Sequence, residues 1–352
     1  MKKQSKTPAA SSDTGPSPEA WQRLTAEADA LAPAERAAGL ARIEAEVADW
    51  PVDPVRRWWS SMSAWRAPGA SAWVCGELRR APAAWVKEIL DGDHSEKHSL
   101  VRALSLDGTK ATATNAARIF ESPFLTNLRV LDCGRDVKLA RAFYKKLAKA
   151  PNLSRVDTLV YYPLQQGGGE ELSAGPAQRH LHGLAALRHL HVRAIVYSTS
   201  NTDSMADAES LLSAPWVDQL ETLEFSMGRS TGWYRLASLY HVLREHSARF
   251  TSLRRIILHD ANELDQLAAS PVLDQVEELV LSMQHDRSLE AALKLLDERG
   301  LPKLRALDAS QMTLANTQAK KDDFVPLTEA ALRKLVEKTK LAKQVDRLTL
   351  ST

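Results

Sequence analysis

A short apolar motif recurs along most of this chain and constrains its fold more than any other feature. The motif is apolar-x-x-apolar-x-apolar, and we number its residues as positions 1 to 6. Its nine copies begin at Val101, Leu128, Val156, Leu187, Leu220, Leu253, Val276, Leu304 and Val345. Successive copies start between 23 and 41 residues apart, a period typical of solenoids, in which each unit buries its apolar face against its neighbours. The sequence therefore predicts an elongated array over residues 99–352.

A second signature precedes the motif in several units. A small residue followed by proline occurs at a constant offset before position 1, as Ser122-Pro123, Ala150-Pro151, Ala214-Pro215 and Ser270-Pro271. Proline cannot continue a helix and disfavours helical dihedrals in the residue before it. We therefore expect each unit to pair a short strand with a helix that ends before this proline. The expected helices cover residues 115–121, 139–149, 177–186, 207–213, 236–246, 264–269, 289–298 and 328–342.

The first quarter of the chain differs from the array. Residues 1–17 are rich in Pro, Ser, Thr and Lys, a composition typical of a disordered tail. Residues 18–98 hold seven of the nine tryptophans, and helical spacing predicts helices over 19–31, 34–50, 55–65 and 83–90. We interpret this region as a Trp-rich helical cap, because the end of a solenoid exposes apolar core that must be covered. The alternative is an aromatic ligand pocket or a groove for a partner helix.

Composition excludes several classes of function. The net charge of +2 is less than the three lysines near the N-terminus contribute, so the array lacks the basic excess of a nucleic-acid binder. The only cysteines are Cys75 and Cys133, too few for a disulfide framework. Neither a secretory signal nor an apolar run of membrane-spanning length is apparent. We expect a cytoplasmic monomer without membrane contact.

The repeated unit resembles the leucine-rich repeat family, in its ribonuclease-inhibitor-like form. Residues 267–281, LAASPVLDQVEELVL, are similar to degenerate units of arrays found in bacteria. The resemblance implies an α/β solenoid with a parallel sheet on its concave face, helices on its convex face and a binding role for the concave face. The asparagine that the family places after each strand is absent, so the turns must be satisfied in another way.

Strand alternation indicates which side chains a partner would meet. Positions 4 and 6 turn toward the core, and positions 3, 5 and 7 face the concave surface. Aromatic and arginine side chains provide most of the binding energy at protein interfaces, and on these rows they concentrate near the centre of the array. The candidate partner-binding residues are Tyr162, His189, His191, Arg193, Glu224, Arg255 and His259. The sequence thus predicts a non-catalytic module that binds a protein partner, which the sequence does not identify.

A metalloprotein or enzyme is the alternative. His189 and His191 project from one face of a strand, and Glu224 lies on the next strand, so two imidazoles and one carboxylate could bind a divalent metal. However, nucleotide-binding glycine loops, zinc-protease motifs and nucleophile elbows are all missing from the sequence. We expect no enzymatic activity and no cofactor.

Overall fold

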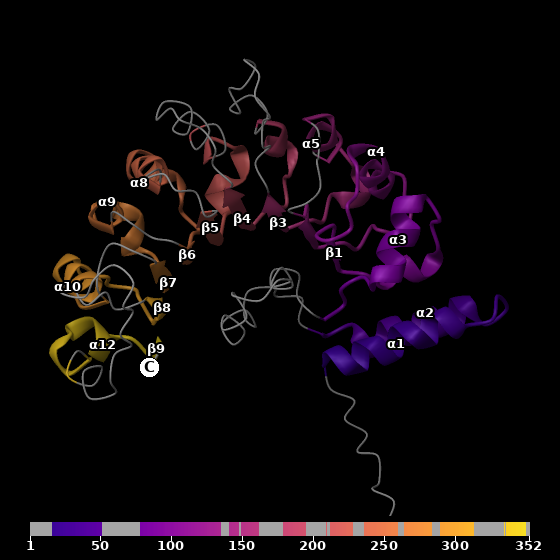
Figure 1. Ribbon diagram of the computed structural model, residues 1–352, viewed down its shortest axis with the longest axis horizontal. Helices are drawn as coiled ribbons and strands as arrows, with labels where there is room; N and C mark the ends of the chain where they lie inside the picture. Colours follow the sequence, from indigo (N-terminus) through magenta and orange to yellow (C-terminus); the bar gives the residue numbers. More distant parts are fainter. Residues whose placement is uncertain are drawn as a thin grey trace, which may run out of the picture.

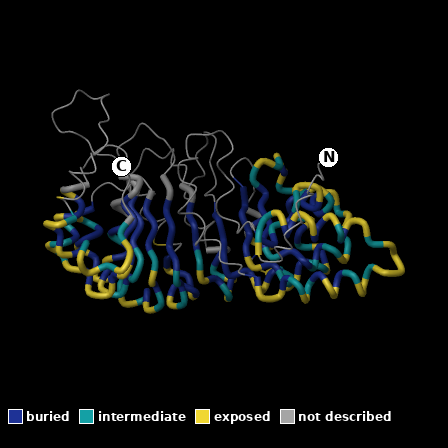
Figure 2. Tube along the Cα trace, turned by 90° about the horizontal axis from the view of Figure 1, so that it is seen from below, coloured by how far each residue is buried: buried dark blue, intermediate teal, exposed yellow. Residues whose placement is uncertain are grey.

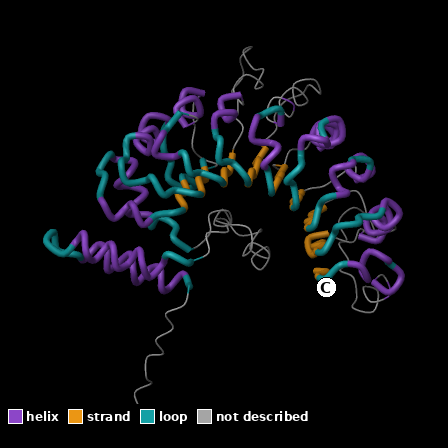
Figure 3. The backbone as a smooth tube through the Cα atoms, turned by 180° about the vertical axis from the view of Figure 1, so that it is seen from behind, coloured by secondary structure: helices purple, strands orange, loops and turns teal. Residues whose placement is uncertain are grey.

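The chain folds into an arc of strands and helices (Figure 1). The computed structural model describes residues 16–50, 78–134, 141–147, 149–161, 179–194, 209, 212–227, 236–259, 264–283, 289–312, 334 and 336–349. The strands line the inner side of the arc and the helices its outer side (Figure 3). This arrangement is compatible with a solenoid-like α/β fold.

The sheet contains nine parallel strands in sequential order. They are β1 Ala103–Ser105, β2 Val130–Asp132, β3 Thr158–Tyr161, β4 His189–Ala194, β5 Thr222–Met227, β6 Arg255–His259, β7 Glu278–Met283, β8 Ala306–Met312 and β9 Arg347–Thr349. The strands all begin at motif position 3, and register pairs each position 4 with position 4 of the next unit, from Leu104 to Leu348. The predicted α/β class and parallel sheet are confirmed.

The helices differ in length and type from unit to unit. The α-helices are α1 Pro18–Ala30, α2 Arg36–Val47, α3 Ala83–Asp91, α4 Ala113–Ala116, α5 Arg141–Leu147, α8 Leu236–Glu245, α9 Leu264–Ala268, α10 Leu289–Arg299 and α12 Lys340–Gln344. Turns of 3-10 helix are η3 Glu96–Leu100, η4 Ala117–Phe120, η5 Pro151–Leu153, η6 Arg179–Gly183, η7 Pro215–Gln219, η8 Ser247–Arg249 and η9 Pro271–Asp274. The expected helices over 55–65 and 207–213 lie largely or wholly outside the described residues.

The repeated proline opens a 3-10 turn as well as ending the preceding helix. Pro151, Pro215 and Pro271 each occupy the first residue of such a turn, after a small residue in extended conformation. This suits proline, whose fixed φ and missing N–H are tolerated at a helical start. The constant offset thus sets the distance from this turn to the next strand.

The helix expected over 328–342 is interrupted at Thr339, whose backbone is extended. A new helix, α12, begins immediately afterwards. The carboxylate of Asp297, on α10, accepts the N–H groups of Lys340 at 3.2 Å and Leu341 at 2.6 Å. This long-range cap satisfies the amides that every helix start leaves unpaired, and the spacing of nearby residues gives no sign of it.

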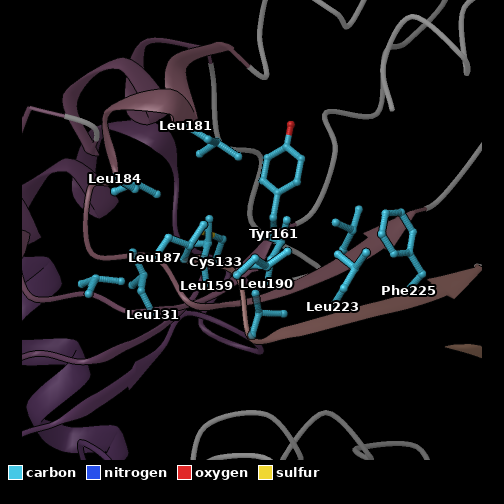
Figure 4. Packing of buried hydrophobic residues seen from close by; sticks show 14 of the residues in the cluster. Leu131, Cys133, Leu159, Tyr161, Leu181, Leu184, Leu187, Leu190, Leu223 and Phe225 are labelled. Carbon is cyan, nitrogen blue, oxygen red and sulfur yellow. The ribbon is translucent and has the colours of Figure 1, made fainter. Parts of the chain in front are cut away.

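One hydrophobic core runs through the whole arc. It extends from Ala20 and Trp21 in α1 to Leu341 in α12. Leucines at motif position 4 of successive strands, among them Leu131, Leu159, Leu190 and Leu223, lie beside one another in this core (Figure 4). Buried residues follow the strands, whereas exposed residues lie along one rim of the arc and on the N-terminal helices (Figure 2).

The ladder of backbone hydrogen bonds between units begins before the first copy of the motif, at Arg79. In each unit the N–H groups of positions 2 and 3 donate to the position-2 carbonyl of the preceding unit, as Arg129 and Val130 do to Arg102. Arg102 and Ala103 donate in the same way to Arg79, and Arg80 pairs with Ala103 in parallel. Residues 78–98 are therefore built like a further unit. They begin with a short segment in which Leu78 and Ala81 are buried, and helix α3 follows it.

Side chains of several kinds hydrogen-bond to the backbone next to the strands. In the second unit the Asp132 carboxylate accepts the Gly134 N–H at 3.0 Å and the Ser105 hydroxyl at 2.8 Å. Before the strands, glutamines donate to backbone carbonyls of the preceding unit, Gln219 to Ala185 and Gln344 to Leu301. Gln275 donates likewise to Phe250.

Candidate partner-binding face

The inner face of the sheet carries three rows of side chains, one at each of motif positions 3, 5 and 7. Strand register joins His189, Thr222, Arg255 and Glu278 in the position-3 row. It joins His191, Glu224 and Ile257 in the position-5 row, and Arg193, Ser226 and His259 in the position-7 row. The motif therefore placed these candidates on their correct strands and in neighbouring rows.

The position-5 row is buried, although we expected it to face solvent. Its polar members include Asp132, His191, Glu224 and Asp308, which are 1%, 3%, 6% and 4% exposed. Apolar members such as Val160, Ile257 and Val280 are at most 1% exposed. The side chains of His191 and Glu224 are therefore shielded from solvent.

His191 and Glu224 instead form a buried pair between adjacent strands. The His191 Nε2 atom lies 3.3 Å from Glu224 Oε1, as the register of β4 and β5 requires. The pair gives each of these two buried polar side chains a partner of complementary chemistry.

The position-3 row is the more accessible one. His189 is half-buried, and its Nδ1 lies 3.0 Å from the Thr222 hydroxyl. Further along, Arg255 Nε donates to Glu278 Oε2 at 2.5 Å, and Arg347 binds the other oxygen of the same carboxylate. The side chain of Arg347 is 58% exposed, whereas those of Arg255 and Glu278 are 18% and 13% exposed.

Glu278 was not among the site residues predicted from the sequence. Arg347 reaches it across Ala306, the member of the row on β8. Position 3 of the last four units holds an arginine, a glutamate, an alanine and an arginine in turn. The small alanine leaves room for the second arginine to reach the glutamate, and this order in the sequence could have identified the cluster.

The remaining candidates are only partly placed. Arg193 and His259 lie in β4 and β6, but their side chains are outside the described residues. Tyr162 lies outside the described residues altogether.

The described residues do not bring a metal-binding group together. Nowhere among them do three His, Cys, Asp or Glu side chains gather as metal ligands would. His189 and His191 contact different residues of β5. No observation on the described residues therefore favours the metal alternative.

Position 2 forms a row along one edge of the sheet, and its members pair across units. Arg129 binds Asp157, Arg188 lies 2.9 Å from Glu221, and Arg254 lies 3.4 Å from Glu277. In each pair the arginine belongs to one unit and the acid to the next. Position 2 of these six units is thus an ordered row of ion pairs.

No model of a known protein family matches this chain, and no curated protein matches it significantly. Among the described residues, no helix is both long and apolar enough to cross a bilayer.

Proposed function

We propose that this protein is a leucine-rich-repeat-type solenoid that binds a protein partner and catalyses no reaction. The cluster of Arg255, Glu278 and Arg347 carries the proposal. It lies on the inner sheet face, two of its members are partly desolvated, and Arg347 extends into solvent. Arginines held in this way are typical anchors of protein interfaces.

The partner is a protein rather than a nucleic acid, because the arginines of the inner face and of the edge row alternate with acids. Phosphate binding requires an uncompensated basic surface. In this proposal the module acts as a cytoplasmic monomer of bacterial type. Residues 18–98 cap the array, with 78–98 continuing its hydrogen-bond ladder, and 99–352 form its repeated units.

The proposed face is tested by capture of partners from a native extract, with mass spectrometry of what is retained. Arg255→Ala combined with Arg347→Ala should abolish capture, and the melting curve checks that the variant is still folded, because the partly buried Glu278 loses both of its arginines. Arg254→Ala is the matched control, because Arg254 also pairs with a neighbouring glutamate but lies on the edge row. If the double variant captures the same proteins as the wild type, the inner face is not the binding surface.

The cap is tested by deletion. Removing residues 1–77 takes away Trp21 and Ile43, which are 4% and 0% exposed, and uncovers the apolar surface they contact. The truncated protein should aggregate. A soluble fragment that melts cooperatively would contradict the cap.

A further inference from the structure

The outer edge of β9 has the features of an interior strand, yet no described strand pairs with it. At every earlier step of the array the position-2 carbonyl accepts two N–H groups from the next unit. In the ninth unit that carbonyl belongs to Asp346, and no described residue donates to it. By the same pattern, the N–H and C=O of Leu348 point toward this edge.

The apolar side chains at this edge are also unusually exposed. Position 1 is at most 2% exposed in the eight preceding units and position 4 at most 1%. In the ninth unit, Val345 and Leu348 are only partly buried, although they pack on the same core. The difference arises because no described unit stacks on them.

The opposite end of the sheet shows that such an edge can be closed. There the Arg80 carbonyl, which points away from β1, accepts the indole N–H of Trp21 at 2.6 Å. Leu24 and Ile43 of helices α1 and α2 cover the adjoining core and are 0% exposed. The described residues provide no equivalent at β9.

The array itself specifies the chemistry of a unit that fits this edge. The third, fifth and seventh units carry an acid at position 2, namely Asp157, Glu221 and Glu277, as the ninth carries Asp346. The units that follow these three, namely the fourth, sixth and eighth, all begin with the pattern Leu-Arg-x-Leu/Ile. The three strands begin Leu187-Arg-His-Leu190, Leu253-Arg-Arg-Ile256 and Leu304-Arg-Ala-Leu307.

Charge favours the same type of strand. From Arg129 onward the position-2 row alternates in sign, so an arginine would follow Asp346. Asp157, Glu221 and Glu277 pair with an arginine of the preceding unit, whereas no ion pair among the described residues involves Asp346. Its exposed carboxylate remains available to a cation.

We propose that the edge of β9 is a second interaction surface, which accepts a parallel strand of the form Leu-Arg-x-Leu/Ile from a repeat unit of another polypeptide. The strand's amides bind the Asp346 carbonyl, its arginine lies beside the Asp346 carboxylate, and its apolar residues cover Val345 and Leu348. Main-chain bonds give affinity in such strand addition, and side-chain pockets give specificity.

The probe is a fluorescent peptide that copies residues 253–275, the shortest unit of this type, titrated into the full-length protein. We expect saturable binding. A peptide with Arg254→Glu should bind several-fold more weakly because two acids would then lie side by side. On the Asp346→Arg protein the preference between the two peptides should reverse, and this exposed substitution leaves the core intact.

Leu348→Arg should abolish binding of both peptides, with the melting curve confirming that the variant is folded. Failure of the wild-type peptide to bind, or an unchanged preference on Asp346→Arg, would overturn the proposal. Light scattering, which measures the mass of the protein in solution, tests whether a second copy of this chain occupies the edge. A protein of twice the monomer mass that becomes monomeric in Leu348→Arg would show that a second copy covers this edge instead.

Discussion

The Arg79 guanidinium donates to the Glu44 carboxylate at 2.5 Å and thereby joins helix α2 to the strand segment that precedes β1. The same carboxylate binds Arg102 through its other oxygen, also at 2.5 Å. Arg79 further donates to the carbonyls of Val47, at the end of α2, and Leu100. Burial, together with the neighbouring Arg79 charge, lowers the pKa of Arg102 to about 10. One glutamate thus holds two desolvated arginines in place.

Replacing Arg79 should therefore destabilise the N-terminal end of the array. Its side chain is 2% exposed, so Arg79→Met leaves the carbonyls of Val47 and Leu100 without this donor and removes one of the two arginines that bind Glu44. We expect a loss of about 3 kcal/mol in the free energy of unfolding, measured by urea denaturation. Arg23→Met is the control, because Arg23 pairs with Glu46 but is 54% exposed, and it should change stability by less than about 0.5 kcal/mol. Equal effects of the two substitutions would contradict this role.

Two glycines with the same backbone conformation should respond differently to alanine. Gly134 and Gly108 both have φ of +74°, where a side chain is strained. A Cβ on Gly134 would lie 2.6 Å from the Leu106 carbonyl carbon, whereas one on Gly108 meets nothing within 4 Å. Gly108→Ala should cost about 1 kcal/mol, and Gly134→Ala clearly more, as measured by thermal melting. A smaller loss for Gly134→Ala would show that the turn after β2 can open.

Stability should fall at mildly acidic pH because of His98. Burial lowers the pKa of His98, against the opposing effect of Glu88, while Lys97 and His94 add to the lowering. Its Nδ1 accepts the Ser95 N–H at 3.3 Å and its Nε2 lies 3.0 Å from Glu88, so the neutral imidazole suits this site. The unfolded chain takes up this proton below about pH 6.5, before the folded protein does. The stabilisation is therefore complete above that pH and is lost as the pH falls toward the folded pKa.

Melting temperatures at pH 7.5 and 5.5 test this effect. The wild type should lose more stability between these pH values than His98→Gln, which cannot titrate. His182, which is half-buried within η6, offers a comparison through His182→Gln. Parallel losses in the wild type and His98→Gln would assign the acid sensitivity to other groups.

The cap of α12 provides a local test of how the last unit is held. Asp297→Ala removes the acceptor for the Lys340 and Leu341 amides and should lower stability by about 1 kcal/mol. Glu298→Ala is the matched control, because the ion pair of Glu298 among the described residues is an exposed one with Lys294, at 3.7 Å. Hydrogen exchange of the Leu341 amide should accelerate in Asp297→Ala alone, and an unchanged rate would argue against the cap.

The sequence by itself determined the periodic part of this protein. The spacing of apolar residues determined which residues enter strands and which turn toward the core. Spacing alone therefore assigned the position-4 residues, from Leu104 in β1 to Leu348 in β9, to the core side of the sheet and located the polar rows beside them. The helices over 18–50 and 83–90 followed from helical spacing, because periodicity directly reports which face is buried.

Only the tertiary structure decided what depends on contacts between units. It buried His191 and Glu224, made Glu278 the centre of an arginine cluster and capped the start of α12 with Asp297 of α10. It also added residues 78–98 to the hydrogen-bond ladder, although Arg79 and Arg80 carry little of the motif. Each of these outcomes joins residues more than twenty positions apart, and local spacing contains no information about which distant groups will meet in a desolvated environment.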